Sequence, residues 1–107
     1  MEAKLIARYL GAMSIEERVQ IIQCLLEASP DGREMLDVAA RIELGAAAVS
    51  KQLESLMGLE LVSVKTRENN KVYFANTALL EQLFDFMYHQ YGPAREKVSP
   101  AVEDSDG

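Results

Sequence analysis

LGAAAVSKQL, at residues 44–53, begins the helix around which the other expected elements can be ordered. Gly45 interrupts the helical pattern before it, and after three alanines the apolar residues recur every three or four positions. This spacing predicts a helix over residues 46–57 with one buried side. That side holds Val49, Leu53, Leu56 and Met57. Gly58 is expected to end the helix in a left-handed conformation, which glycine adopts without steric cost.

Three further helices are expected before this stretch, at residues 3–11, 15–28 and 35–42. Ser14 and Glu17 have the spacing of a capping box, which would begin the second of these helices. The Ser-Pro-Asp-Gly sequence at residues 29–32 combines strong turn formers and separates the second helix from the third. The side chains of the third helix that are available for burial are Leu36, Ala39, Ala40 and Ile42.

After residue 60 the apolar period changes from that of a helix to that of a strand. Residues 61–66 and 71–75 alternate between apolar and polar side chains, with residues 67–70 between them, so a β-hairpin is predicted. A last helix follows, capped by Thr77 and ending at Gly92. Its apolar residues cover more than one face, which predicts contacts with its own core and with a second chain.

The composition fits one small domain. The chain has 107 residues, of which 49% are hydrophobic, and no tryptophan. We expect a folded unit at residues 1–92 and a flexible acidic tail at residues 93–107. Cys24 is the single cysteine, which argues against a disulfide within the chain and against a zinc site built on a cysteine cluster. No apolar run is long enough to span a bilayer, so a cytoplasmic protein with no membrane partner is expected.

The charge balance argues against a protein that binds nucleic acid through bulk charge. Lys and Arg total 11 against 17 Asp and Glu, for a net charge of −6. Residues 41–71 are the exception, because five basic residues outnumber four acidic ones there. A contact with a polyanion is therefore expected within that segment.

The order of helix, helix, helix-turn-helix, hairpin and terminal helix is that of a winged helix-turn-helix domain, mainly α with a β-hairpin. Over residues 13–92 the chain resembles the ArsR family of bacterial repressors. The residues that carry the resemblance are Arg18 to Ile22, Leu44 to Leu53, Leu56 to Val62, and Val72-Tyr73. The resemblance implies a homodimer formed by the first and last helices, a recognition helix at residues 46–57 in the major groove, and the hairpin as a wing. The interface residues that it implies are Leu5, Ile6, Tyr9, Leu80, Leu83, Phe84, Met87, Tyr88 and Tyr91.

The metal sites of that family are not matched in this sequence. The family's cysteine pair would fall near Glu34 and Leu36, and neither is a cysteine. On the last helix, where the family gathers several His and carboxylate ligands, there is only His89 with Asp85 one turn earlier. A single pair of this kind is more often a solvated surface pair than a metal site. No metal and no cofactor are expected.

A redox-sensing branch of the family has two cysteines, at positions that look like Gln23 and Gly92 here. Cys24 is one residue away, where a buried and inert thiol is the ordinary interpretation. The chain is most similar to members that lack both kinds of sensor, such as the nodulation-regulator type. The last helix of that type ends in a pair that resembles Tyr91-Gly92.

Direct contact with bases requires hydrogen-bond donors and acceptors, and the three alanines at residues 46–48 offer only methyl groups. Gln52 can address adenine, and Lys51 a phosphate or guanine. Small residues at the start of a helix let the backbone approach a phosphate closely. The DNA contacts expected from this helix are Ala46, Ala47, Ser50, Lys51, Gln52 and Ser55.

The hairpin supplies a second group of candidates, for contact with the DNA backbone or minor groove. They are Lys65, Arg67, Asn69, Asn70 and Lys71. Hairpin tips are usually polar whatever they do, so a solvated tip is an equal alternative. Arg41 can meet a phosphate or form an ion pair with Glu43 or Asp37.

Two functions follow from these residues. The first is a homodimeric transcriptional repressor that binds a pseudo-palindromic DNA operator. The second is a winged-helix interaction module or anti-repressor with little affinity for DNA, which the acidic balance and the alanines favour. An enzyme is not expected, because no paired carboxylates, Cys-His or Ser-His arrangement or phosphate-binding glycine loop is visible. An effector pocket between protomers is a further alternative, and nothing in the sequence identifies its occupant.

Overall fold

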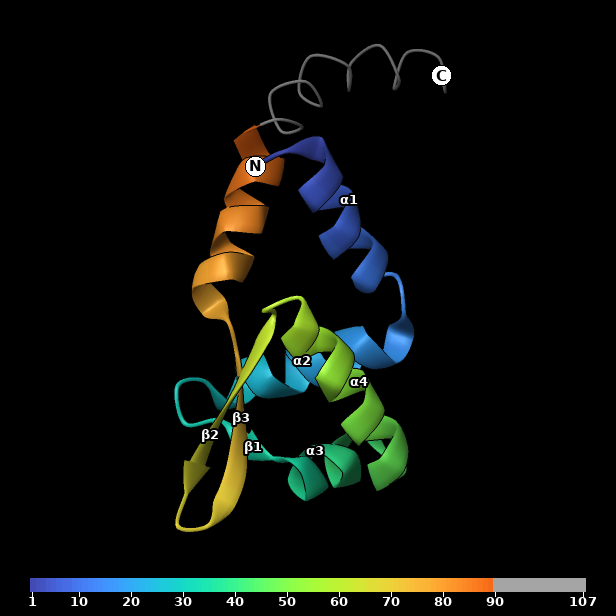
Figure 1. Ribbon diagram of the computed structural model, residues 1–107, viewed down its shortest axis with the longest axis vertical. Helices are drawn as coiled ribbons and strands as arrows, with labels where there is room; N and C mark the ends of the chain where they lie inside the picture. Colours follow the sequence, from blue (N-terminus) through green and yellow to red (C-terminus); the bar gives the residue numbers. More distant parts are fainter. Residues whose placement is uncertain (90–107) are drawn as a thin grey trace, which may run out of the picture.

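The computed structural model describes residues 1–89, so residues 90–92 of the expected domain, the expected tail and Tyr91 lie outside the described part. The elements are α1 (Ala3–Ala12), α2 (Glu16–Ala28), β1 (Arg33–Glu34), α3 (Met35–Ile42), α4 (Ala46–Gly58), β2 (Val62–Arg67), β3 (Asn70–Ala75) and a last helix described over residues 77–89. In Figure 1, α2, α3, α4 and the sheet form a body from which α1 and the last helix rise, while the hairpin turn lies at the opposite end. The predicted fold class, mainly α with a β-hairpin, is confirmed.

The sheet has three antiparallel strands in the order β1-β3-β2. The hairpin register runs from Val62 opposite Ala75 to Arg67 opposite Asn70. The connection is therefore the two residues Glu68 and Asn69, both with positive φ (50° and 68°), and not the four residues expected. Two positive φ values match the twist of the strands, which favours this tight turn.

Strand β1 was not predicted from the sequence. It consists of Arg33 and Glu34 only, which pair with Tyr73 and Val72 of β3. Two residues cannot show an alternating pattern, so the strand exists only because β3 offers a free edge to the segment before α3.

The expected capping box is wrong. The hydroxyl of Ser14 donates to the carbonyl of Gly11 at 2.6 Å, which closes the end of α1 instead of starting α2. Helix α2 begins at Glu16 with Ile15 at the N-cap position and no side-chain cap. Because Ile15 and not Ser14 lies at the N-cap position, Ser14 is one residue too early to accept from the first amides of α2.

The end of α4 and the start of the last helix also differ from expectation. Gly58 remains within α4, and the left-handed conformation falls on Glu60, with a φ of 62°. The last helix is capped by Asn76 instead of Thr77, because the Oδ1 atom of Asn76 accepts from the Leu79 amide at 3.1 Å. The Nδ2 atom of Asn76 donates to the Glu60 carbonyl at 2.7 Å. One side chain thus joins the end of α4 to the start of the last helix, because the amide of Asn76 has its donor and its acceptor on separate atoms.

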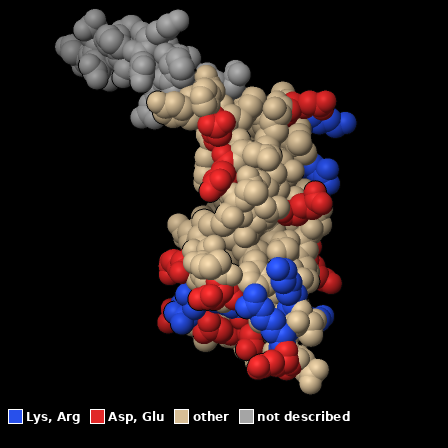
Figure 2. Space-filling model, turned by 90° about the vertical axis from the view of Figure 1, so that its left-hand side faces the viewer, with Lys and Arg blue, Asp and Glu red and all other residues tan. Residues whose placement is uncertain are grey.

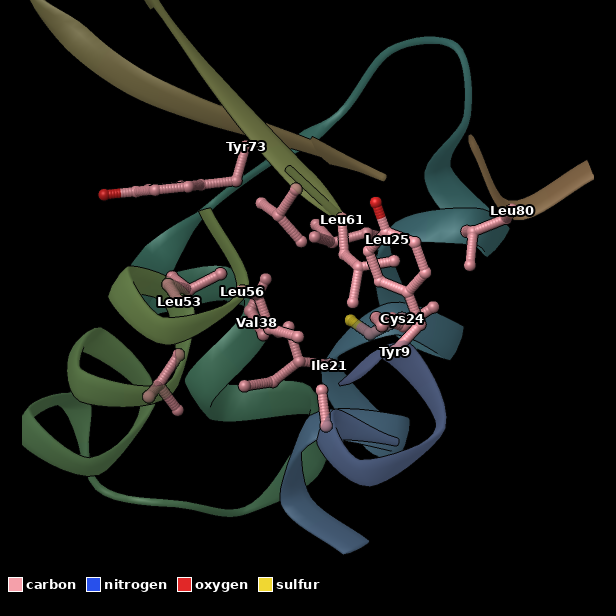
Figure 3. Packing of buried hydrophobic residues seen from close by; sticks show 14 of the residues in the cluster. Tyr9, Ile21, Cys24, Leu25, Val38, Leu53, Leu56, Leu61, Tyr73 and Leu80 are labelled. Carbon is pink, nitrogen blue, oxygen red and sulfur yellow. The ribbon is translucent and has the colours of Figure 1, made fainter. Parts of the chain in front are cut away.

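The hydrophobic core lies between α2, α3, α4 and the start of β2. Its fully buried large side chains are Ile21, Ile22, Leu25, Val38, Val49, Leu53, Leu56 and Leu61. Figure 3 shows Tyr9 of α1 and Leu80 of the last helix at one edge of this cluster, and Tyr73 of β3 at another, with its hydroxyl pointing away from it. The core therefore joins the rising helices to the body.

Helix α3 buries only part of the side that was expected: Ala39 is buried and Ile42 is half-buried against the core, but Leu36 and Ala40 are exposed. Val38 is fully buried, whereas Leu36 is 68% exposed. The bounds of the helix, Met35–Ile42, match the prediction. The error concerns orientation, because α2 and α4 decide which side of so short a helix is covered.

Candidate nucleic-acid interface

Helix α4 is held to the core by one side and exposes the other. Val49, Leu53 and Leu56 are buried. Ala47, Ala48, Ser50 and Lys51 are exposed. Lys51 forms no ion pair within residues 1–89. The exposed positions of the helix thus carry the cation of Lys51, the hydroxyl of Ser50, two alanine methyl groups and the carboxylate of Glu54.

Gln52 lies at the edge of this face and has a partner that the sequence did not suggest. The Nε atom of Arg18, at the start of α2, donates to Oε1 of Gln52 at 2.9 Å. Both side chains are half-buried. The two residues are 34 positions apart. No local pattern could have joined them, although Arg18 belongs to one of the segments that carry the family resemblance.

Two other candidates on α4 are less available than their residue types suggest. The hydroxyl of Ser55 lies 3.4 Å from the Lys51 carbonyl, to which it donates within the helix. Ala46 is half-buried, while Ala47 is exposed. Of the six expected residues, Ala47, Ser50 and Lys51 present the most open surface.

The cations of the hairpin are divided between the two faces of the sheet. Ser63 pairs with Phe74, and Thr66 with Lys71. Because side chains alternate along a strand, Lys65 and Arg67 share the face of Phe74 and Lys71 lies on the other. Lys65 Nζ is 5.6 Å and the Arg67 guanidinium carbon 5.1 Å from the centre of the Phe74 ring, within the range of cation–π contacts.

The tip of the hairpin is open to solvent. Asn69, Asn70 and Lys71 are all exposed. Figure 2 shows Lys and Arg side chains gathered around the lower end of the molecule, where the hairpin lies, with Asp and Glu side chains beside them. The hairpin end is therefore locally basic on a surface of mixed charge.

Arg41 is partly neutralised by a neighbour on its own helix. Its Nε atom lies 3.1 Å and 3.2 Å from the two carboxylate oxygens of Asp37, which also accepts from Arg33 at 3.1 Å. Hydrogen bonds from Arg33 and Arg41 hold the pKa of Asp37 below its ordinary value. Of the two ion pairs left open by the sequence, the structure forms the one with Asp37.

The expected interface residues of α1 and the last helix fall into two groups. Ile6, Tyr9, Leu80 and Leu83 are buried within the protomer. Leu5 and Met87 are half-buried. Phe84 and Tyr88 are 60% and 68% exposed. The last helix therefore does have a second apolar side, which Phe84 and Tyr88 form.

Cys24 is buried in the core, and its sulfur is visible among the side chains of the cluster in Figure 3. Burial raises the pKa of its thiol.

His89 and Asp85 form an exposed pair, with Nδ1 of the histidine 3.2 Å from Oδ1 of the aspartate. Within residues 1–89 no three His, Cys, Asp or Glu side chains gather as a metal site would require. None of the helices in that range is both long and apolar enough to cross a membrane.

Comparison with known proteins finds similarity in structure but not in sequence. Neither a protein-family model nor a curated protein sequence matches the chain. An ArsR-like transcriptional regulator from Rhodococcus sp. RHA1 is similar, with a TM-score of 0.72 and 21% identity over 94% of this chain and 92% of that one. NolR from Sinorhizobium fredii has a TM-score of 0.65 and 22% identity over 84% of this chain and 87% of its own.

A third solved structure is the homodimeric winged helix-turn-helix DNA-binding domain of Mb0332 from Mycobacterium bovis, described as a possible ArsR-family regulator. Its TM-score is 0.66, with 19% identity over 90% of this chain and 84% of that one. The resemblance expected from the sequence is thus confirmed at the level of the fold: the chain has the winged helix-turn-helix fold of ArsR-like regulators.

Proposed function

We propose that this protein is a DNA-binding transcriptional regulator of the ArsR type, which acts as a homodimeric repressor in the cytoplasm. The observation that carries the proposal is the exposed face of α4. Ser50 and Lys51 are exposed and Lys51 has no ion-pair partner among the described residues, while the opposite side of the helix packs into the core. A helix of this kind in a winged helix-turn-helix fold enters the major groove.

The hairpin would act as the wing beside that groove. Lys65 and Arg67 lie on one face of the hairpin and Lys71 lies on the other. Either face could therefore contact the phosphates of the DNA backbone. Lys51, Arg67 and Asn70 are the residues we expect to contact DNA first, with Arg41 held back by Asp37. Phosphate contacts position such a domain, and base contacts specify its site.

A second copy is needed for a specific operator. Ala47 and Ala48 offer only methyl groups, so one recognition helix discriminates few base pairs. Two helices related by a twofold axis would contact two half-sites about 34 Å apart, which doubles the sequence that is recognised. The Mycobacterium bovis domain, a homodimer, supports this assembly.

The competing function is a protein-interaction module. The net charge of −6 and the methyl surface of α4 favour it, because both weaken attraction to a polyanion. An interaction module would bind its partner through α4 without a dependence on the cations of the hairpin.

The experiment that separates the two functions is a titration of the purified protein with duplex DNA from upstream of its own gene, at two salt concentrations. We expect Lys51→Ala and Arg67→Ala each to weaken binding and to lower the slope of log K against log salt by about 2, since a dimer loses two phosphate contacts. Lys4→Ala, an exposed cation on α1, is the matched control. No binding by the unmodified protein at low salt would contradict the proposal.

A further inference from the structure

The pair formed by Arg18 and Gln52 fixes which atoms of Gln52 remain for a ligand. Arginine has five N–H donors and no acceptor, and it keeps its charge at every accessible pH. The atom of Gln52 that faces the guanidinium must therefore be the carbonyl oxygen Oε1, as the 2.9 Å contact has it. The Nε2 group, with its two N–H donors, makes no hydrogen bond within the described chain.

This arrangement changes what Gln52 can recognise in the major groove. Contact with adenine uses both ends of a glutamine amide, the oxygen accepting from N6 and the nitrogen donating to N7. Guanine presents two acceptors, N7 and O6, and thymine presents O4. Oε1 keeps a second lone pair, but the guanidinium already sets the orientation of the amide, so adenine could use that lone pair only if the same orientation also placed Nε2 on N7.

We propose that Arg18 is a positioning residue for base recognition: by holding Oε1 toward α2 it leaves the Nε2 donors of Gln52 for the groove, which favours the acceptors of guanine or thymine over adenine, whose N6 group is a donor. The inference rests on the proposed function and reverses the base that the sequence alone suggests for Gln52. It also explains why a half-buried arginine of α2 points at the recognition helix and not at a carboxylate.

The test begins without DNA. The side-chain amide signals of Gln52 in an amide NMR spectrum should shift in Arg18→Met, which removes the donor and keeps an apolar stem. They should remain in place in Arg8→Met, which removes an exposed cation on α1. Unshifted Gln52 signals in Arg18→Met would show that the contact does not form in solution and would overturn the inference.

The second step measures base preference. The unmodified protein and its variants are used to select duplexes from a random-sequence pool, and the enriched sites are compared position by position. At the base pair whose preference is lost in Gln52→Leu, the unmodified protein should favour guanine or thymine over adenine by about tenfold. Arg18→Met should raise the relative affinity for adenine by a similar factor, while Arg18→Lys, which keeps a donor, should restore part of the original preference.

The outcomes distinguish the two levels of the argument. A preference for adenine in the unmodified protein, or the same preference in Arg18→Met, would overturn the inference and leave the proposed function standing. Gln52→Leu without an altered base preference would also overturn it, because Gln52 would then contact no base. If no duplex is enriched at all, the proposed function fails, and base recognition by Gln52 fails with it.

Discussion

Gly32 lies where the turn between α2 and β1 crosses the hairpin. Its φ is +77°, and a Cβ atom added there would come within 2.6 Å of the Phe74 ring and 2.7 Å of the Val72 side chain. The turn therefore sits directly on the face of the sheet that carries Lys65 and Arg67. Gly32, which the sequence marks only as a turn former, therefore also packs against the base of the hairpin.

We expect Gly32→Ala to lower the free energy of unfolding by roughly 2 kcal/mol, through the strained φ and the crowding of Phe74. Gly11→Ala is the matched control, because Gly11 is in α1 and a Cβ atom there meets nothing within 4 Å. The control should be neutral or more stable by about 0.5–1 kcal/mol. Urea unfolding followed by circular dichroism measures both variants, and equal losses of stability would contradict the account.

Helices α3 and α4 form the helix-turn-helix pair. In the proposed complex with DNA, Asp37 of α3 would compete with a phosphate for Arg41. Asp37 accepts from Arg33 before the helix and from Arg41 one turn later. Since the pKa of Asp37 is lowered, its carboxylate is present above its ordinary pKa, and the pairs are lost only as the pH falls through the lowered value. At neutral pH the Asp37 carboxylate is therefore ionised and able to accept from both arginines.

Asp37→Asn should release Arg41 and strengthen DNA binding several-fold, with a steeper dependence on salt. Glu34→Gln is the control, because it removes the same charge from an exposed neighbour that forms no ion pair among residues 1–89. A DNA titration at two salt concentrations compares the variants. If both bind DNA equally, the effect is one of net charge and Arg41 makes no contact.

At the scale of the whole molecule, the feature that needs explanation is the apolar side of the last helix. Phe84 and Tyr88 are 60% and 68% exposed, whereas Leu80 and Leu83 of the same helix are buried in the protomer. Two large aromatic residues one turn apart on an open face are typical of an interaction site. A second copy of the chain would cover them and would set the spacing of the two recognition helices.

Phe84→Glu should dissociate the homodimer and weaken operator binding at least tenfold, because each protomer would then hold only one half-site. Gln82→Glu places the same charge on an exposed position of the same helix and should leave the dimer intact. Sedimentation equilibrium gives the mass of each variant. A Phe84→Glu protein that keeps the mass of a dimer would show that the interface lies elsewhere.

The helices and the hairpin can be predicted from the sequence alone, whereas strand β1 cannot. Apolar spacing placed α3 at Met35–Ile42 and put the start of α4 at Ala46, and the change of period located the hairpin. These properties depend on residues within a few positions of one another. The exposed polar side of α4, with Ser50 and Lys51, follows from the same spacing.

The folded chain, in contrast, determines which side chains meet. It paired Arg18 with Gln52 and joined Asn76 to Glu60, and it buried Val38 instead of Leu36. The physical reason is the same in each case: a hydrogen bond or a buried contact depends on side chains brought together from distant parts of the chain. Local periodicity cannot specify those partners, because it records how often apolar residues recur and not what they will face.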